Sequence, residues 1–408
     1  MESQITEKAL KLMEITDWKL CNHCLGRKFS KIVEGEDNKY RGEYVRQILS
    51  DENYRSLNMD SCYICGNIFD DVKNGVIEKI VSKLKEEGIE FETFLIGCRV
   101  LPEILVKEEE IQKSLELDVE SIKKEINREI GKILSLELQK EVDFDYPDIV
   151  IMVDLVKDKI AIQINPIFIE GRYKKFIRGI PQTKWPCRKC RGKGCLSCDY
   201  TGKMYPESVE ELISAIPLQL FRGNDSKFHG AGREDIDVKM LGNGRPFVLE
   251  IKEPRIRNFD LKNLQSKINE HAHGKVEVTD LKPTGRKQKS MIKNSSTDTY
   301  KVYRAIVETE DEIKEEELDK LSFLDIINQR TPIRVSHRRA DKIRTRKVRQ
   351  IRTKIINPSR FEMIVECEGG LYIKELISSD EGRTSPSVAE ILGKKALCVQ
   401  LDVLEVNI

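Results

Sequence analysis

The chain has 408 residues, of which 39% are hydrophobic and 34% are charged. This length predicts two or three domains, and the composition is typical of a soluble, compact protein. No apolar run approaches the roughly 18–20 residues of a membrane span, and the N-terminus lacks a signal-peptide core, so we expect no membrane association. A net charge of +1 excludes a uniformly polycationic protein. Eleven cysteines, largely in CxxC pairs, indicate metal ligands in a reducing cytoplasm.

The first cysteine pairs follow an amphipathic helix that we expect over residues 5–15. Four thiolates in two CxxC pairs predict a tetrahedral structural zinc site, and buried free cysteines are the alternative. Gly26 and Gly66 follow the pairs and suit the turns that point backbone N–H groups at sulfur. We expect His23 on the surface, outside the ligand set. The predicted ligands are Cys21, Cys24, Cys62 and Cys65.

The segment 67–176 mixes helical and strand patterns, which predicts an α+β domain. The expected helices cover 72–87 and 119–134, and the expected strands cover 91–100, 148–154 and 159–164. The run P-D-I-V-I-M-V, followed by G-R-Y-K-K, resembles a THUMP domain, an RNA-binding module of tRNA-modifying enzymes. An ordinary α+β domain is the other interpretation.

The linker 177–205 carries two more CxxC pairs, separated by four residues and accompanied by turn-forming glycines. The C-x-x-C-x-G-x-G string resembles the repeat of DnaJ-type zinc modules and favours a compact zinc ribbon. A redox role or partial ligation is the alternative. Surrounding Lys and Arg residues favour contact with phosphate. The predicted ligands are Cys187, Cys190, Cys195 and Cys198.

The segment from Phe228 to Ile251 is rich in glycine around a short acidic stretch and then becomes an apolar strand. Arg233 stands two residues before Asp235, close enough to keep that carboxylate ionised and aimed. Asp237 competes for the same role, and a Gly-rich hairpin with solvated charges is the plain interpretation. The residues resemble the Gly-Arg-x-Asp catalytic loop of pseudouridine synthases.

The longer string G-R-E-D-x-D-V-K-M-L-G-x-G-R-P-F resembles the archaeal and eukaryotic tRNA pseudouridine synthase family called Pus-ten. The resemblance implies that Asp235 is the nucleophile and that Tyr303, in the K-x-Y setting with Lys301, stacks on the base and accepts a proton. It further implies that Tyr372 is a second substrate-side tyrosine and that Arg383 is a basic group at the pocket. As plain alternatives, both tyrosines are half-buried strand residues.

The segment 326–360 contains twelve Lys and Arg residues against the single acid Asp341. Such a dense run is expected to contact an RNA backbone rather than form a core, although a solvated strand pair is the other interpretation. In the family resemblance it matches a loop that grips the tRNA arm. The expected RNA contacts are Arg338, Arg339, Lys342, Arg344, Arg346 and Lys347.

Together these observations predict an α+β protein in which a zinc-binding segment (1–66), a THUMP-like domain (67–176), the linker (177–205) and a catalytic domain with a mixed or antiparallel sheet (206–408) follow one another. The resemblance implies isomerisation of uridine 55, and in archaeal members also uridine 54, of the tRNA T-arm. It implies structural zinc, no organic cofactor and no obligatory protein partner. A non-catalytic tRNA-binding protein, or a THUMP-type modifier of another reaction class, is the alternative.

Overall fold

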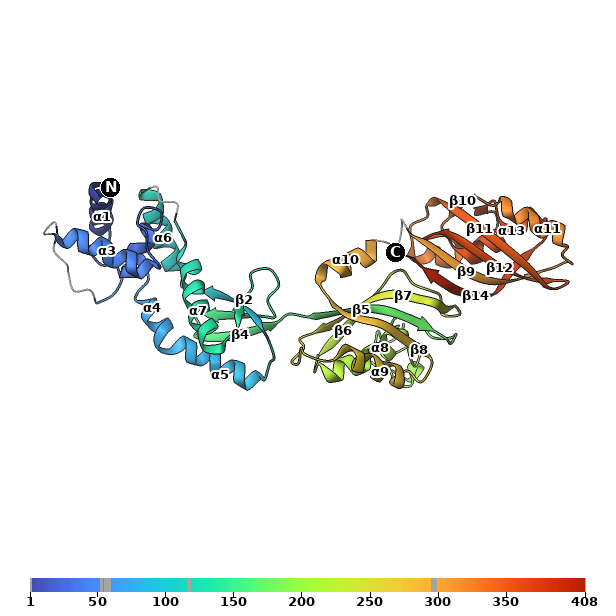
Figure 1. Cartoon of the computed structure of the whole chain (residues 1–408), viewed down its shortest axis with the longest axis horizontal. Coiled ribbons are helices and arrows are strands. Elements are labelled where there is room, and N and C mark those ends of the chain that lie inside the picture. The colour runs from blue at the N-terminus through green and yellow to red at the C-terminus, as the bar shows by residue number, and fades with distance from the viewer. Residues whose placement is uncertain (1, 52–53, 55–59, 116–118, 295–298, 408) are drawn as a thin grey trace. The chain divides into compact units, whose positions relative to one another are not determined.

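The computed structural model describes residues 2–51, 54, 60–115, 119–294 and 299–407. The chain divides into two compact units, Met1–Asn165 and Pro166–Ile408 (Figure 1). Within the described ranges, no helix has the length and apolar character needed to span a membrane. The division precedes the domain end expected at residue 176, because β5 (Ile167–Lys175) pairs with strands of the second unit.

Unit 1 combines helices with a small mixed sheet of order β2-β1-β3-β4. Its elements are α1 (Glu2–Ile15), α2 (Asn22–Lys28), α3 (Asn38–Asp51), α4 (Ile68–Asp71), the π-helical turn η1 (Val72–Val76), α5 (Ile77–Glu87), β1 (Thr93–Arg99), α6 (Pro102–Ser114), α7 (Ile122–Leu138), β2 (Glu141–Val142), β3 (Ile149–Asp154) and β4 (Lys159–Ile164). The helix expected over 119–134 is confirmed as α7. Its Ile122, Ile126 and Ile130 are fully buried, because side chains four residues apart share one helical face.

Unit 2 is built on a ten-stranded sheet of order β13-β10-β11-β12-β9-β14-β7-β5-β8, with β6 also paired to β7. Besides β5, its elements are η2 (Leu196–Cys198), α8 (Val209–Leu220), β6 (Asp225–Gly230), β7 (Lys239–Lys252), α9 (Leu261–His271), β8 (Val276–Thr284), α10 (Arg286–Asn294), β9 (Tyr300–Thr309), α11 (Glu315–Asp319), η3 (Lys320–Phe323), β10 (Ile326–Arg330), η4 (Ile333–Arg338), β11 (Ile343–Asn357), β12 (Arg360–Glu368), α12 (Ile373–Ser378), β13 (Thr384–Ser385), α13 (Val388–Leu392) and β14 (Ala396–Val406). The predicted α+β class is confirmed.

Two parts of the large sheet meet where β14 runs parallel to the start of β7. Asp402 aligns with Lys239 and Val403 with Met240, whereas the other recorded pairs of this sheet are antiparallel, so the sheet is mixed as predicted. This short pairing involves the first residues of β7, before its apolar stretch. The segment 231–238, which joins β6 to β7, therefore ends at the junction of the two parts of the sheet.

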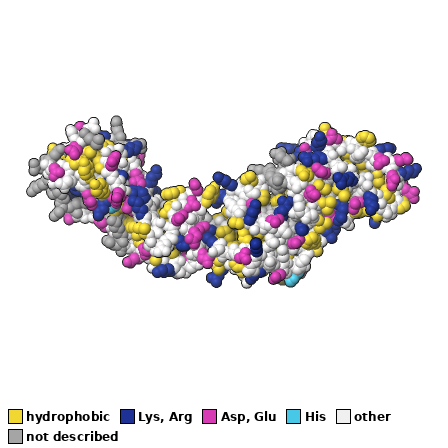
Figure 2. Space-filling model, viewed as in Figure 1, with side chains coloured by type: hydrophobic (Ala, Val, Ile, Leu, Met, Phe, Trp, Pro, Cys, Tyr) yellow, Lys and Arg dark blue, Asp and Glu magenta, His cyan; other side chains and the backbone are white. Residues whose placement is uncertain are grey.

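Helices α8 and α9 cover one end of this sheet. Figure 1 shows α8 and α9 against the strands β5, β6 and β8, and their Val209, Ile213, Leu264 and Ile268 belong to the buried core of unit 2. On the visible surface, Lys and Arg side chains alternate with Asp and Glu side chains, in keeping with the near-zero net charge (Figure 2).

Candidate active site

The acidic loop, residues 231–238, is anchored by the buried side chain of Glu234. Arg245 donates from Nε to Glu234 Oε2 at 2.9 Å, and the hydroxyl of Tyr173 donates to the same carboxylate at 2.8 Å. A buried ion pair is tolerated when such hydrogen bonds satisfy both charges. Glu234 is buried, whereas its neighbours Arg233 and Asp235 are exposed and half-buried.

The backbone of the same loop is held by buried polar side chains. Lys175 Nζ donates to the carbonyl oxygens of Asp235 and Ile236, each at 3.3 Å. Burial, the largest cause, lowers the pKa of Lys175. Gln182 Nε2 donates to the Gly232 carbonyl at 3.0 Å. These contacts fix the direction in which the Asp235 side chain leaves the loop.

The carboxylate of Asp235 lies at a small cavity of about 120 Å³. Oδ2 of Asp235 is 2.9 Å from Nη1 of Arg334 and 3.9 Å from Nζ of Lys374. Arg334 comes from η4 and also donates from Nε to Glu375. The Asp235 side chain keeps 34% of its surface exposed, so it is paired with cations and still accessible.

The two expected tyrosines line this cavity, from β9 and from the residue before α12. Burial, the largest cause, raises the pKa of Tyr303 well above its ordinary value. The Arg334 guanidinium lies over the ring of Tyr372, 5.7 Å from its centroid. The other lining residues are six apolar side chains, Val238, Val335, Leu371, Ile373, Leu401 and Val403, and six charged ones, Arg233, Glu234, Arg245, Arg334, Arg339 and Lys374.

Three other expected site residues take different places. Arg233 lines the cavity, and its guanidinium lies 5.7 Å from the centroid of the Trp185 ring. Lys301 is buried behind the loop: burial, the largest cause, lowers its pKa to about 8, and a Cβ on Gly232 would lie 3.3 Å from its Nζ. Arg383 donates to the Thr331 carbonyl and to Asp341, away from the residues that line the cavity.

Arg334 and Lys374 are the basic groups that the sequence interpretation missed. Among the described arginines, Arg334 is the one recorded at ion-pair distance from Asp235. It sits inside the basic run, where no local pattern distinguishes it from its neighbours. Lys374 follows Tyr372 by two residues, and that proximity was the available signal. Its Nζ also lies 2.6 Å from Asp237, whose side chain remains 64% exposed and does not line the cavity.

The basic run begins at the cavity and continues into the hairpin of β10 and β11. Arg339 lines the cavity together with Arg334, whereas Lys342 and Lys347 are exposed and Arg344 donates to the Thr331 hydroxyl at 3.0 Å. Arg346 is half-buried beside Gly370, where a Cβ would lie 3.3 Å from its Nε. The side chain of Arg338 lies outside the described residues. The described cations therefore extend from the cavity toward the hairpin.

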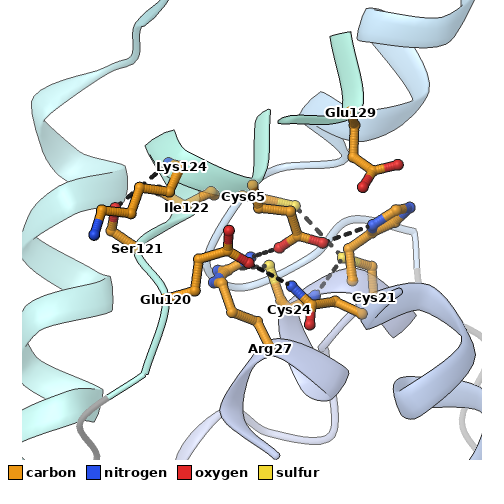
Figure 3. A network of polar contacts seen from close by, with 12 residues as sticks. Cys21, Cys24, Arg27, Cys65, Glu120, Ser121, Ile122, Lys124 and Glu129 are labelled. Atoms are coloured by element: carbon orange, nitrogen blue, oxygen red, sulfur yellow. Dashed lines mark hydrogen bonds and ion pairs between the residues drawn. The ribbon is translucent and has the colours of Figure 1, made fainter. Parts of the chain in front are cut away.

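The first cysteine group joins α2 to the segment before α4. The four sulfur atoms of Cys21, Cys24, Cys62 and Cys65 lie within 4.8 Å of one another, and could hold a metal ion. Backbone N–H groups of Cys21 and Cys24 donate to sulfur at 3.4 Å each. Arg27 donates from Nη2 to Cys24 Sγ at 3.5 Å, and Figure 3 shows it beside this cluster.

Two expectations around this group need correction. His23 is buried rather than on the surface: its ring stacks on Phe69 with centroids 4.2 Å apart, and Nδ1 lies 3.0 Å from Glu125 Oε1. Gly66 has a φ of +59°, as a turn requires. Gly26 instead lies inside α2, where a Cβ would come within 1.8 Å of the Asn38 carbonyl oxygen, so it permits close packing of α2 on α3.

The second cysteine group is a compact loop around η2. The four sulfur atoms lie within 4.8 Å of one another, and Gly194 and Gly202 donate backbone N–H bonds to sulfur at 3.2 and 3.3 Å. Both glycines have positive φ, and a Cβ on Gly202 would lie 2.4 Å from the Gly192 carbonyl oxygen. The set can likewise hold a metal ion, and consists of Cys187, Cys190, Cys195 and Cys198.

Two solved structures show a distant likeness to the chain. A chain of a crystal structure of a Cbf5-Nop10-Gar1 complex aligns with 56% of this chain and 48% of its own, at 18% identity and a TM-score of 0.31. A crystal structure of a pseudouridylate synthase aligns with 73% of this chain and 87% of its own, at 12% identity and a TM-score of 0.24. These scores carry no argument for function.

Comparison with protein sequences is decisive. The family model "Pus10, C-terminal" matches residues 168–407, and the model "Pus10 THUMP domain, archaeal" matches residues 76–154. The tRNA pseudouridine synthase Pus10 of Methanothermobacter marburgensis is 52% identical over 99% of both chains. That of Pyrococcus furiosus is 43% identical over 98% of both. These matches decide against the two alternative functions, and the chain belongs to the Pus10 family of tRNA pseudouridine synthases.

Proposed function

We propose that the chain isomerises uridine 55, and also uridine 54, in the T-arm of tRNA, with Asp235 as the nucleophile. One observation carries the assignment of the nucleophile: Asp235 faces a cavity, paired with Arg334 and flanked by Tyr303 and Tyr372. The choice of the T-arm rests on the likeness of the catalytic motifs to the family.

In the proposed reaction the Asp235 carboxylate attacks either the ribose or the base, and the N1–C1′ bond of uridine breaks. The freed uracil turns, a bond forms between C5 and C1′, C5 loses its proton and N1 gains one. Arg334 and Lys374 hold the carboxylate at the cavity. The balance is complete within the substrate, so the reaction requires no organic cofactor.

Tyr303 supplies a surface on which the flipped base stacks. Its raised pKa keeps it in the phenol form at neutral pH, which suits stacking and hydrogen-bond donation better than removal of the C5 proton. In the route through the ribose, the Asp235 carboxylate that leaves C1′ is the base within reach. Tyr372 is the second aromatic side chain at the cavity, and the guanidinium of Arg334, which is paired with the Asp235 carboxylate, lies over its ring.

The tRNA is held by the basic run and by the THUMP domain in this proposal. Arg338, Arg339, Lys342, Arg344, Arg346 and Lys347 would contact backbone phosphates, since guanidinium and ammonium groups bind phosphate irrespective of sequence. We assign zinc to both cysteine groups because four thiolates within 4.8 Å of one another favour that ion. The cysteines are free thiols, which fits a reducing compartment, and we propose the cytoplasm.

The test of the nucleophile is Asp235→Asn, which keeps the shape of the side chain and removes its charge. We expect loss of pseudouridine formation with tRNA affinity within about twofold, because phosphate contacts are unchanged. Asp237→Asn is the matched control and should keep activity. Turnover by Asp235→Asn within about tenfold of the parent, roughly 1.4 kcal/mol, is too small a loss for a nucleophile and would reject the role.

The test of position uses tRNA transcripts in which uridine 54, uridine 55 or both are replaced by cytidine. Pseudouridine is mapped in each transcript after incubation with the parent enzyme. We expect modification of uridine 54 in the transcript that lacks uridine 55, and of uridine 55 in the transcript that lacks uridine 54. Product outside these two positions in the doubly replaced transcript would contradict the assignment to the T-arm.

A further inference from the structure

The acidic loop is bound along its backbone by one short stretch of chain, residues 175–182, which we call the cradle segment. Two side chains of this segment hold carbonyl oxygens of the loop. In addition, its Gly179 N–H donates to the Ile236 carbonyl at 2.9 Å. Its Arg178 donates from Nη1 to the Asp237 carbonyl at 2.7 Å. The backbone that follows the proposed nucleophile is therefore held by the cradle segment as well.

Arg178 also reaches a second wall of the cavity. Its Nη1 donates to the Leu401 carbonyl at 2.7 Å, and its Nη2 pairs with the carboxylate of Asp402. The Asp402 side chain is only 1% exposed, so its charge requires a partner within the protein. Leu401 belongs to β14 and lines the cavity. One guanidinium therefore connects the acidic loop to the strand that forms part of the cavity wall.

The local sequence explains how Arg178 comes to this place. The next residue, Gly179, has a φ of +91°, which side chains rarely adopt, so the chain turns directly after the arginine. Ile180 then enters the buried core of unit 2 and holds the turn in position. Arg178 does not line the cavity. Any effect that it has on the reaction must therefore pass through the residues that it binds.

We propose that Arg178 is a positioning residue for the reaction. It fixes the acidic loop against β14, and thereby fixes the place of the Asp235 carboxylate relative to the bound uridine. The role rests on the proposed function, in which Asp235 is the nucleophile. Accurate placement matters because a shift of about 1 Å in a reacting group can cost on the order of a hundredfold in rate. Nη1 and Nη2 of Arg178 both serve acceptors within the protein, which disfavours a role in holding an RNA phosphate.

Two variants of the full chain test this role. Arg178→Met removes the guanidinium and keeps an apolar stem. Arg178→Lys keeps a charge beside Asp402 but lacks the planar fork with which arginine serves several acceptors at once. Its thermal midpoint should therefore recover more fully than its rate.

The matched control is Arg172→Met. Arg172 is also half-buried, and it also connects β7 with β14 through carbonyl oxygens. It donates to Asn243 at 2.6 Å, to Gly244 at 2.9 Å and to Val406 at 2.7 Å. None of these three acceptor residues lines the cavity. The control thus removes a comparable set of hydrogen bonds from unit 2 without releasing the acidic loop.

The first measurement compares the single-turnover rate at saturating enzyme with the affinity for tRNA. Because the loop is displaced, Arg178→Met should lower the rate roughly ten- to hundredfold, and Arg178→Lys about three- to tenfold. Affinity should stay within about threefold of the parent in both variants, since no phosphate contact is removed. Arg172→Met should keep its rate within about twofold of the parent, because the cavity walls stay in place.

The second measurement is hydrogen exchange of residues 231–238, which does not depend on activity. Exchange in this segment should be faster in Arg178→Met than in Arg172→Met, because the loop has lost an anchor. A lowered rate with unchanged exchange would show that Arg178 acts without holding the loop, and would overturn the proposal. A rate equal to that of Arg172→Met would overturn it too, and so would a loss of affinity alone. If Arg178→Met fails to fold, Arg178→Lys decides in the same way.

Asp235→Asn, measured beside these variants, separates the two levels of the proposal. An active Asp235→Asn would refute the nucleophile itself. An inactive Asp235→Asn together with a fully active Arg178→Met would refute the positioning role and leave the proposed function intact.

Discussion

Nη1 of Arg334 lies 2.9 Å from Oδ2 of Asp235, and the same guanidinium donates to Glu375 and covers the ring of Tyr372. One side chain thus connects the acidic loop with η4 and with the start of α12. Glu375 is buried, so it fixes Arg334 from behind. We infer that Arg334 positions the carboxylate for attack.

Replacement of Arg334 by Ala should lower kcat roughly ten- to hundredfold, because hydrogen bonds to charged groups contribute about 1.5–3 kcal/mol. Affinity for tRNA should change by less than about threefold, since one phosphate contact at most is lost. Single-turnover kinetics with saturating enzyme measure the chemical step, and filter binding measures affinity.

Arg334→Lys should recover part of kcat. Arg330→Ala, which removes an exposed arginine paired with Asp341, is the control. A fall in affinity alone would assign Arg334 to RNA binding.

The sequence could suggest Asp235, Tyr303 and Tyr372 because each lies in a local string that resembles a family motif, and the structure brings all three to one cavity. Both cysteine groups could be suggested for the same reason, since CxxC spacing is local. Arg334 could not, because its role depends on the packing of η4 against a loop distant in sequence.

Glu234 could not be recognised either. In the short Gly-Arg-x-Asp motif it is the unspecified position between Arg233 and Asp235, and its buried contacts are with Arg245 from β7 and Tyr173 from β5. The division into two compact units before β5 could not be read from the sequence for a related reason. Strand β5 follows the THUMP strands without a break in pattern, and only its pairing with β7 and β8 places it in unit 2.

Glu234→Ala should destabilise unit 2 by about 3–5 kcal/mol, because it leaves Arg245 charged, buried and unpaired. Urea unfolding can be followed by Trp185 fluorescence in a Trp18→Phe background, since the chain has two tryptophans. Glu234→Leu combined with Arg245→Met should recover most of the loss. Asp237→Ala removes an exposed ion pair and should cost less than about 1 kcal/mol. A Glu234→Ala variant as stable as Asp237→Ala would show that the buried pair does not hold the loop.

The purified chain should contain two equivalents of zinc, one for each cysteine group. Cys65→Ser should lower the content to one and loosen unit 1, because structural thiolate sites contribute folding free energy. Cys398→Ser, outside both groups, should retain two equivalents.

A chelator should remove metal first from the second group. Two of its four cysteines are half-exposed, whereas only one is half-exposed in the first group. Zinc content is measured by elemental analysis. A parent chain without zinc would refute both sites. A parent with one equivalent, which Cys65→Ser retains and Cys190→Ser loses, would place the metal in the second group alone.

Replacement of Lys342, Arg344 and Lys347 together by Ala should weaken tRNA binding and reduce its dependence on salt. Each lost phosphate contact should flatten the slope of log affinity against log salt by about 0.7–0.9, so three contacts give a change of roughly two to three. The fold should survive, because Lys342 and Lys347 are exposed and Arg344 is half-buried.

The matched control is the triple Ala variant of Lys314, Lys320 and Lys395, three exposed lysines elsewhere in unit 2. It removes the same net charge, so it accounts for the general electrostatic attraction between protein and RNA. Equal slopes for the two triple variants would show that the hairpin of β10 and β11 is an ordinary solvated surface, and its assignment to the RNA backbone would have to be withdrawn.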